Sequence, residues 1–366
     1  MKYDYIIVGA GIFGSVCARE LSDAGAKCLV IDKRQHIGGN CYTKDVGGIH
    51  VHQYGPHIFH TNSDYVWNYI NKFAKFNHFR LRPKVRYNDS LYSFPINLMT
   101  LYQVWGVKTP EEAEKKLKSV RVSIENPQSM EEYALSQIGE ELYNIFIKGY
   151  SQKQWGKDPR YLPSKILKRI PIRMNFNDDY FDDKYHGIPI GGYTSIFEKL
   201  LNGIEVKCGV DYIEDKINID KMGRKVIYTG PLDEFFNYEL GELEWRSLRF
   251  EHESLNIKDY QGCAVVSYGN YEIPYTRICE HKHFEFGKQD FTVITKEYPN
   301  KWDKNQEKYY PVNDEKNNSL AVMYKQKIDT SKYVFGGRLA DYMYYDMHQV
   351  FGSALNCAQE EINNEA

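Results

Sequence analysis

Apolar and polar residues follow three successive patterns along this chain. Near the N-terminus, two apolar runs, residues 5–8 and 28–31, read as strands on either side of a predicted helix. From about residue 97 to residue 170 the pattern is helical, and beyond Gly187 the alternation typical of strands returns. The pattern therefore predicts an α/β fold that begins with a βαβ unit and contains more than one domain.

Capping signals place the helices of the middle stretch. Thr109 precedes Pro110 and two glutamates, and Ser129 opens a capping box that Glu132 completes. Gly139 predicts that the second of these helices stops there. We expect these helices to form a bundle inserted between the first strands and the later ones.

Five later segments are predicted strands. They cover residues 204–208, 225–228, 264–268, 291–295 and 333–335. The first two suggest a return to the N-terminal domain, and the next two suggest an antiparallel sheet. The last leads through a glycine pair into a helix that begins at about Met347 and carries the C-terminus.

The turn after the first strand has the spacing of a dinucleotide-binding motif. Gly9 permits the turn, Gly11 lets a pyrophosphate approach the backbone, and Gly14 lets the following helix pack on the strand. Asp32 closes the second strand, where its carboxylate can accept hydrogen bonds from a ribose. A glycine-rich turn without a ligand is the alternative, but the whole βαβ unit in order argues against it.

A second glycine turn narrows the choice of cofactor. Gly38, Gly39 and Asn40 let backbone lie beside a long ligand, as in flavoproteins of the glutathione-reductase and amine-oxidase type, so we expect FAD. Lys33 and Arg34 offer a place for a 2′-phosphate. The Asp32 carboxylate would repel that phosphate, which disfavours NADP as the tightly held ligand.

Composition excludes several classes of partner. The 366 residues include 47 Lys plus Arg and 49 Asp plus Glu, a formal net charge of −2, so we expect neither nucleic acid nor an anionic membrane as a partner. Seven cysteines without CxxC spacing predict reduced buried thiols and no metal site. The chain enters its first strand almost at once and has no long apolar span. We therefore expect a cytoplasmic protein with no integral membrane segment.

Tyrosine is over-represented, with 31 residues. Tyr180, Tyr309, Tyr310 and Tyr344 fall in turn-like settings, and each offers a stacking face together with a hydroxyl, which suits a nucleotide sugar. For any one of them, an ordinary half-buried tyrosine remains an equal alternative.

Taken together, these segments resemble the bacterial UDP-galactopyranose mutase family from end to end. The segments that carry the resemblance are residues 3–9, 36–40, 54–61, 148–150, 153–156, 168–171, 187–189, 191–193, 280–284, 295–299 and 346–349. The resemblance implies a Rossmann-like FAD-binding domain, an inserted helical bundle and a six-stranded antiparallel β-sheet domain. It places the FAD domain at 1–75, about 195–245 and 320–366, the bundle with a mobile loop at about 97–178, and the sheet domain at about 76–96, 179–194 and 246–319.

The resemblance also implies an isomerase. It would interconvert UDP-galactopyranose and UDP-galactofuranose by covalent catalysis through N5 of reduced FAD, with no net redox change. NAD(P)H or another reductant would be needed only transiently. The product would supply galactofuranose for cell-surface polysaccharide such as lipopolysaccharide or capsule, and we expect a homodimer.

Two arginines match the pyrophosphate-binding arginines of the family. They are Arg169 and Arg277, whose guanidinium forks give bidentate contacts that a lysine does not reproduce. Without the family resemblance, the basic residues around Arg169 indicate that it belongs to a solvent-exposed basic surface. Glycine and proline on either side of Arg169 predict the mobile loop, which would carry it onto the pyrophosphate.

The remaining site residues also follow from the resemblance. Phe146, Tyr150, Trp155 and Tyr180 match uridine-binding aromatics, with Tyr180 as the uracil stacking partner, although Phe146 taken alone is better explained as bundle core. Tyr309, Tyr310, Tyr344 and Asp346 match positions near phosphate and sugar. The catalytic set is Arg169, Arg277, His57, Tyr344 and Asp346. The flavin-binding set is Gly9, Gly11, Phe13, Gly14, Asp32, Lys33, Gly39, Asn40, His57, Val210, Arg338 and Met347. His60 favours plain UDP-galactose over its N-acetylated relative.

Two other classes of protein share parts of this pattern. A redox flavoenzyme of the amine-oxidase type has the same FAD-binding motif, but its substrate site needs an aromatic cage and not paired arginines. A nucleotide-sugar binding module that retains FAD without turnover is the second alternative. Tight UDP binding with no conversion under dithionite would identify it.

Overall fold

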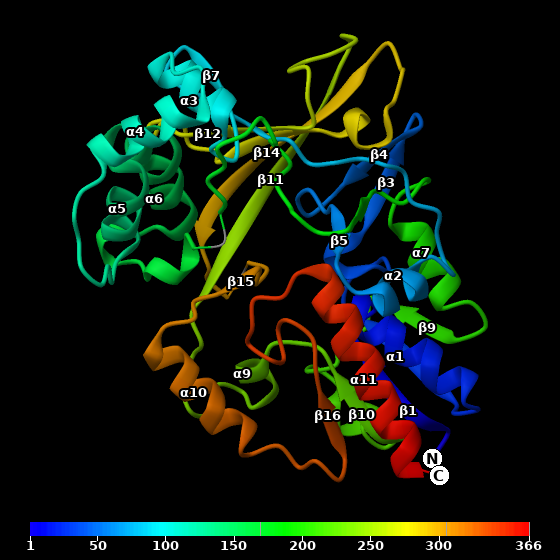
Figure 1. Cartoon of the computed structure of the whole chain (residues 1–366). Coiled ribbons are helices and arrows are strands. Elements are labelled where there is room, and N and C mark those ends of the chain that lie inside the picture. The colour runs from blue at the N-terminus through cyan, green and yellow to red at the C-terminus, as the bar shows by residue number, and fades with distance from the viewer. Residues whose placement is uncertain (169, 305, 366) are drawn as a thin grey trace. The chain divides into compact units, whose positions relative to one another are not determined.

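The computed structural model describes residues 1–168, 170–304 and 306–365, and it divides the chain into two compact units (Figure 1). Unit 1 is made of Met1–His78, Asp183–Ser247 and Trp302–Ala366, and unit 2 of Phe79–Asp182 and Leu248–Lys301. Arg169 lies outside the described residues. No helix among the described ranges has both the length and the apolar character needed to cross a membrane.

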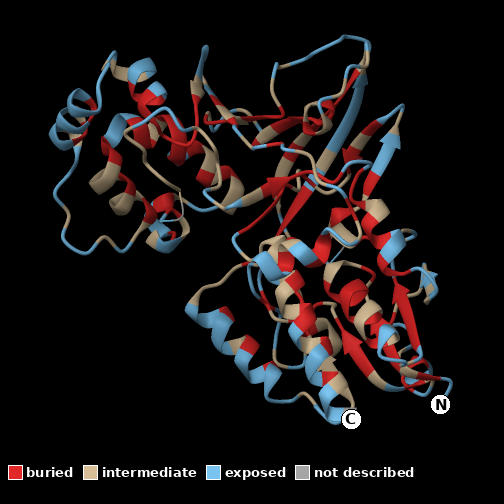
Figure 2. Ribbon diagram, turned by 45° about the vertical axis from the view of Figure 1, so that its right-hand side comes forward, coloured by how far each residue is buried: buried red, intermediate tan, exposed pale blue. Residues whose placement is uncertain are grey.

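A parallel five-stranded sheet forms the centre of unit 1. Its order is β16 (Tyr333–Phe335), β10 (Gly223–Tyr228), β1 (Tyr3–Val8), β2 (Cys28–Asp32) and β9 (Glu205–Cys208). Strands of a parallel sheet are buried on both faces, and this explains why the runs 5–8 and 28–31 are continuously apolar. The strands β1 and β2 and the second half of β10 are buried, as the red arrows of Figure 2 show, whereas the edge strands β9 and β16 are only partly covered.

Helices cover this sheet. The helix α1 (Ile12–Asp23) packs beside α11 (Met347–Glu365), the last helix of the chain (Figure 1). Cys17 Sγ donates to the carbonyl of Ala354 at 3.5 Å, and Tyr5 Oη donates to Glu361 Oε2 at 3.1 Å. The other helices of unit 1 are α2 (Asp64–Ile70), α7 (Thr194–Leu200), α8 (Lys216–Ile219), α9 (Leu232–Phe235) and α10 (Glu315–Lys325). The predicted strands 204–208, 225–228 and 333–335 and the predicted C-terminal helix are present.

Three short strands follow the Rossmann-like βαβ unit. The hairpin of β3 (Thr43–Val46) and β4 (Ile49–His52) comes first, and then β5 (Phe59–Thr61), which pairs with β8 (Tyr185–Gly187). These strands are only three or four residues long, which is too short for alternation to stand out in the sequence.

Unit 2 is built on a mixed sheet. Its strands, in order, are β11 (Trp245–Leu255), β14 (Thr292–Lys301), β13 (Arg277–Glu280), β12 (Val265–Tyr268), β6 (Lys84–Tyr87) and β7 (Ser90–Ser93). The first three residues of β11 belong to unit 1, where Trp245 and Arg246 pair with β15 (Tyr310–Pro311). The predicted six-stranded antiparallel sheet is therefore a seven-stranded sheet.

The predicted antiparallel order also needs correction at one place. The pair β12 and β6 is parallel. The two strands come from segments of the chain far apart in sequence, joined through the helical insertion, so no hairpin constrains their relative direction.

The helices of unit 2 begin where the capping signals predict. They are α3 (Leu98–Trp105), α4 (Pro110–Val120), α5 (Met130–Tyr143), the π-helical turn η2 (Asn144–Lys148) and α6 (Gly149–Trp155), followed by the 3₁₀ turns η3 (Pro159–Tyr161) and η4 (Ser164–Ile166). The Thr109 side chain caps α4, and Ser129 and Glu132 form the capping box of α5. Gly139 breaks the helical backbone with φ 73°, but the helix resumes and continues to Tyr143.

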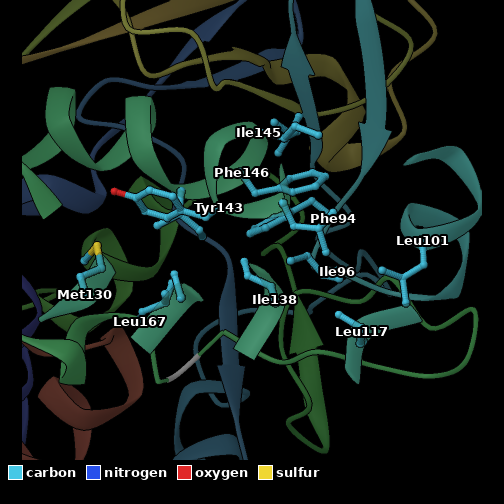
Figure 3. Packing of buried hydrophobic residues seen from close by; sticks show 14 of the residues in the cluster. Phe94, Ile96, Leu101, Leu117, Met130, Ile138, Tyr143, Ile145, Phe146 and Leu167 are labelled. Carbon is cyan, nitrogen blue, oxygen red and sulfur yellow. The ribbon is translucent and has the colours of Figure 1, made fainter. Parts of the chain in front are cut away.

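The apolar faces of these helices meet in one core (Figure 3). Leu101, Leu117, Ile138 and Leu142 are almost completely buried in it, and the core extends to Val85 on β6. The helices and the sheet of unit 2 thus share a hydrophobic core. The division of the chain into two units therefore differs from the predicted division, in which the bundle and the sheet are separate domains. It also places residues 183–194 in unit 1 and not with the sheet.

Candidate functional site

Two glycines of the first turn in unit 1, Gly9 and Gly14, have no room for a side chain. A Cβ on Gly9, at φ +106°, would lie 2.0 Å from Thr229 Oγ1, and a Cβ on Gly14 would lie 2.0 Å from the carbonyl oxygen of Gly9. Gly11 caps α1 with φ −80° and without a side-chain hydrogen bond. The first-turn N–H groups of α1 therefore have no side-chain cap, which suits an anion at this helix N-terminus.

The second glycine turn lies directly against the first. A Cβ on Gly39 would approach the Cα of Gly11 to 3.0 Å, and the Gly38 N–H donates to the carbonyl of Ala10 at 2.8 Å. Two stretches of bare backbone thus lie side by side. Together with the open end of α1, they form a cradle that fits the pyrophosphate of a dinucleotide.

Asp32 connects the first glycine turn to the end of β2. Its Oδ2 accepts from the Ala10 N–H at 2.7 Å, and its Oδ1 accepts from the Arg34 N–H at 2.8 Å. The carbonyl of Asp32 accepts from the Val210 N–H at 3.0 Å. A carboxylate has about four lone-pair sites, so these bonds leave capacity for a ribose hydroxyl.

Glu307 pairs with both cations that follow Asp32. Lys33 Nζ lies 3.6 Å from Glu307 Oε1, and Arg34 Nη2 lies 3.1 Å from Oε2. Arg34 also donates to Asn40 Oδ1 at 3.0 Å and stacks over the Tyr54 ring at 4.3 Å. Burial lowers the pKa of Arg34 while Glu307 raises it, and the net shift is upward. Because Glu307 compensates both charges, this site attracts a 2′-phosphate less than the bare pair of cations would.

Phe13 and the glycine pair 336–337 pack on each other. A Cβ on Gly336 would lie 2.0 Å from Phe13 Cζ. The next residue, Arg338, has its guanidinium carbon 5.9 Å from the centre of the Tyr310 ring, and Tyr310 stacks on Tyr344 with centroids 5.6 Å apart. Three predicted site residues of unit 1 thus come together.

The other predicted residues of unit 1 lie on short connections. The His57 N–H donates to His52 Nδ1 at 3.0 Å, and His57 Nδ1 lies 2.8 Å from the Gly55 carbonyl oxygen. Met347 opens α11 directly after Asp346, and its sulfur lies 3.6 Å from Cys41 Sγ. Tyr309 is only 4% exposed, so it is more deeply buried than a residue that stacks on a substrate needs to be.

His60 belongs to a polar cluster in the same unit. Its Nδ1 lies 2.8 Å from Asp183 Oδ2, and its ring lies edge-to-face with that of His348, with centroids 5.1 Å apart. Burial lowers the pKa of His60, while the bond to Asp183 acts in the opposite direction. Near neutral pH, His60 is therefore mainly the neutral imidazole.

Arg277 in unit 2 is held by a carboxylate that sequence reasoning did not single out. Its Nε and Nη2 donate to Glu297 Oε2 at 2.9 and 2.8 Å, and Glu297 is only 1% exposed. Arg277 and Glu297 are partners in the register of β13 and β14. The ion pair fixes the plane of the guanidinium at the beginning of β13.

The predicted uridine-binding aromatics of unit 2 divide into two groups. Tyr150 and Trp155 are half-buried on α6, and Tyr180 is half-buried after the loop that follows η4. Phe146 is 4% exposed and stacks on Phe94 with centroids 5.8 Å apart, in the shared core (Figure 3). Phe146 therefore occupies the core position that its own pattern favoured.

One group of three side chains among the described residues has the composition of a metal site: Asp259, Glu280 and His283. Both oxygens of Glu280 already accept hydrogen bonds, from the Tyr260 and Gln261 N–H groups and from Thr292. Burial raises the pKa of Glu280, but these bonds and His283 lower it to about 2. The group is thus explained by the pairing of His283 with the two carboxylates, and it does not require a metal ion.

Comparisons with known proteins agree with this architecture. A family model described as GLF: UDP-galactopyranose mutase matches residues 145–344, and one described as an NAD(P)-binding Rossmann-like domain matches residues 7–73. The N-terminal part of unit 1 is thus a Rossmann-like dinucleotide-binding domain.

Several relatives match almost the whole chain, two of them as follows. A dTDP-fucopyranose mutase of Escherichia coli is 42% identical over 98% of this chain and 98% of its own length. A probable UDP-galactopyranose mutase of Klebsiella pneumoniae is 40% identical over 99% of this chain and 95% of its own. Among solved structures, that of a reduced UDP-galactopyranose mutase has a TM-score of 0.77 at 14% identity, with 99% and 96% coverage. These similarities confirm the predicted fold class and the family resemblance.

Proposed function

The chain belongs to the UDP-galactopyranose mutase family, and from this premise we propose that it interconverts UDP-galactopyranose and UDP-galactofuranose without net redox change. The observation that carries the proposal is the Arg277–Glu297 pair. A guanidinium held in a fixed plane by a buried carboxylate is suited to a diphosphate, which must be bound as a leaving group and kept in place for its return.

The cradle of unit 1 supports FAD as the cofactor. The residues that would hold it are Gly9, Gly11, Phe13, Gly14, Asp32, Lys33, Gly39, Asn40, His57, Val210, Arg338 and Met347. When bound and reduced, the flavin supplies an electron-rich N5 for covalent chemistry at the anomeric carbon. Arg338 would balance the negative charge of the reduced ring, and His57 would offer it or the sugar a hydrogen bond.

Other residues of this chain would bind the sugar nucleotide and orient it. Arg277, together with Arg169, would hold the pyrophosphate, while Tyr150, Trp155 and Tyr180 would pack against the uridine. Tyr344 and Asp346 would lie near the sugar. The stacking of Tyr344 on Tyr310 limits its rotation and so supports a positioning role for it.

A second substrate is favoured by one observation, the 42% identity to the dTDP-fucopyranose mutase. A dTDP-linked 6-deoxy sugar undergoes the same change of ring size and presents the same pyrophosphate. It differs at the base, the ribose and carbon 6. The chemistry of the site therefore suits both substrates, and rates on each must decide between them.

The test is direct. The purified protein, loaded with FAD and reduced by dithionite, is incubated with UDP-galactofuranose, and formation of UDP-galactopyranose is followed by chromatography. The same assay with dTDP-fucofuranose, run in the same direction, gives the ratio of kcat/KM. One reduction should support many turnovers. Consumption of reductant or oxygen in proportion to product would favour the amine-oxidase alternative, and UDP binding without conversion would favour the binding module.

The cytoplasmic location and the homodimer belong to the same proposal. Sedimentation of the FAD-loaded protein should give twice the chain mass of 42.9 kDa. A single-chain mass at micromolar concentration would contradict the dimer.

A further inference from the structure

Lys153 is a buried lysine that donates to two main-chain carbonyls. It lies on α6 and is 8% exposed. Its Nζ donates to the carbonyl oxygen of Tyr268 at 2.8 Å and to that of Tyr275 at 3.0 Å. Tyr268 ends β12, and Tyr275 comes two residues before Arg277, the first residue of β13. The ammonium group therefore bridges the two ends of the connection 269–275.

The same face of α6 touches that connection with its backbone. Gly149 is one helical turn before Lys153, and a Cβ on it would lie 2.1 Å from the Gly269 carbonyl oxygen and 3.0 Å from the Tyr271 nitrogen. The absence of a side chain at Gly149 lets the helix come close to the connection 269–275. The long side chain of Lys153 spans the remaining distance to its carbonyls. Both features act on the peptide segment that leads into Arg277.

This arrangement is unfavourable for the charge itself. Burial lowers the pKa of Lys153 to about 8, although Glu272 acts in the opposite direction. An apolar side chain of similar length would fill the space without desolvating an ammonium group. What the lysine adds is therefore directional: its donors fix two carbonyls relative to the helix.

We propose that Lys153 is a positioning residue for the mutase reaction, which holds α6, with Tyr150 and Trp155, in register with the β12–β13 connection that leads into Arg277. The inference rests on the proposed function, since it concerns how the uridine side and the pyrophosphate side of one nucleotide are kept at the right separation. Lys153 acts through these residues and not on the substrate.

The test uses the FAD-loaded protein with Lys153→Met, which keeps the length and removes the donors, and Lys153→Arg, which keeps charge and donors. Lys157→Met is the matched control, because Lys157 is exposed just beyond α6. Lys153→Met should raise the Kd for UDP and the KM for the sugar nucleotide by about 3- to 30-fold. Its kcat should change less than its KM, Lys153→Arg should restore at least half of the lost affinity, and Lys157→Met should behave as the parent.

Stability and amide exchange separate positioning from general damage. The melting temperature of Lys153→Met should be equal to that of the parent or higher, because a buried charge is removed, while exchange in residues 269–277 becomes faster. Unchanged UDP affinity, or unchanged exchange in that segment, overturns the proposal. Should Lys153→Met not fold, Lys153→Gln carries the same expectations.

Failure of the proposal for Lys153 can be distinguished from failure of the proposed mutase function. If the parent binds UDP but converts no substrate, the mutase proposal fails and the UDP affinities still decide the role of Lys153. If the parent does not bind UDP, the exchange measurement alone decides it.

Discussion

The two units differ in the features that we propose for binding an anionic ligand. In unit 1 the means is bare backbone: Gly11 and Gly39 face each other without side chains, and Gly9 and Gly14 lie where a Cβ would clash with the protein itself. In unit 2 the means is a charged side chain, Arg277, oriented by buried Glu297. Backbone geometry allows almost no substitution, whereas an oriented side chain can be weakened by degrees. The predictions below test this contrast.

The largest effect is expected for Gly14→Ala. Its Cβ would lie 2.0 Å from the backbone oxygen of Gly9, which cannot move without displacing α1, so stability should fall by about 1–3 kcal/mol and FAD binding should be lost. Gly11→Ala is the informative partner, because its Cβ meets only the Gly39 Cα at 3.8 Å. It should keep the melting temperature of the apo-protein and still lose FAD affinity, as measured by fluorescence titration. Full FAD affinity in Gly11→Ala would show that no pyrophosphate approaches there.

Arg277→Ala should have the next largest effect. A hydrogen bond to a charged group contributes about 1.5–3 kcal/mol, so kcat/KM should fall by about 10- to 150-fold. The sequence predicts the same loss for Arg169→Ala. FAD content should change little in either variant. The melting temperature of Arg277→Ala should fall, because the change leaves the buried Glu297 carboxylate without its cation. Normal turnover in both variants would contradict the pyrophosphate role.

Glu297→Gln should weaken the same function more gently. The amide keeps the shape of the side chain but loses the charge that orients Arg277, and we expect kcat/KM to fall by about 10-fold. In a double-mutant cycle with Arg277→Ala, the two effects should not add, because both act through one pair. Additive losses would show that Glu297 acts independently of Arg277.

The smallest effect concerns stability and pH. Because the pKa of Lys153 is about 8 in the folded protein against an ordinary 10.5, the unfolded chain binds more protons between these values, and the stability contribution of this group rises with pH there. Relative to Lys153→Met, the unfolding free energy of the parent should rise by about 1 kcal/mol per pH unit across that window. Urea unfolding at pH 7.5, 8.5 and 9.5 measures it. A constant difference would mean that Lys153 titrates normally.

Unit 1 was predictable because its signals are local. The glycines and Asp32 lie within one βαβ unit, and each restricts the backbone in a known way. Unit 2 depends on partners that are distant in sequence. Glu297 pairs with Arg277 across an antiparallel register that alternation alone could have suggested. The bridge from Lys153 to Tyr268 and the parallel pair β6 and β12 join segments more than 100 residues apart, and no local pattern encodes them.

The packing of α11 on α1 has a consequence for synthesis on the ribosome. The first helix made has the last helix as its neighbour, and Tyr5 on the first strand bonds Glu361 near the C-terminus. The nascent N-terminal segment therefore has an apolar surface that stays uncovered until α11 has been translated. A chain that terminates before α11 should lack this cover and become a substrate for chaperones and proteases, although its whole glycine motif is present.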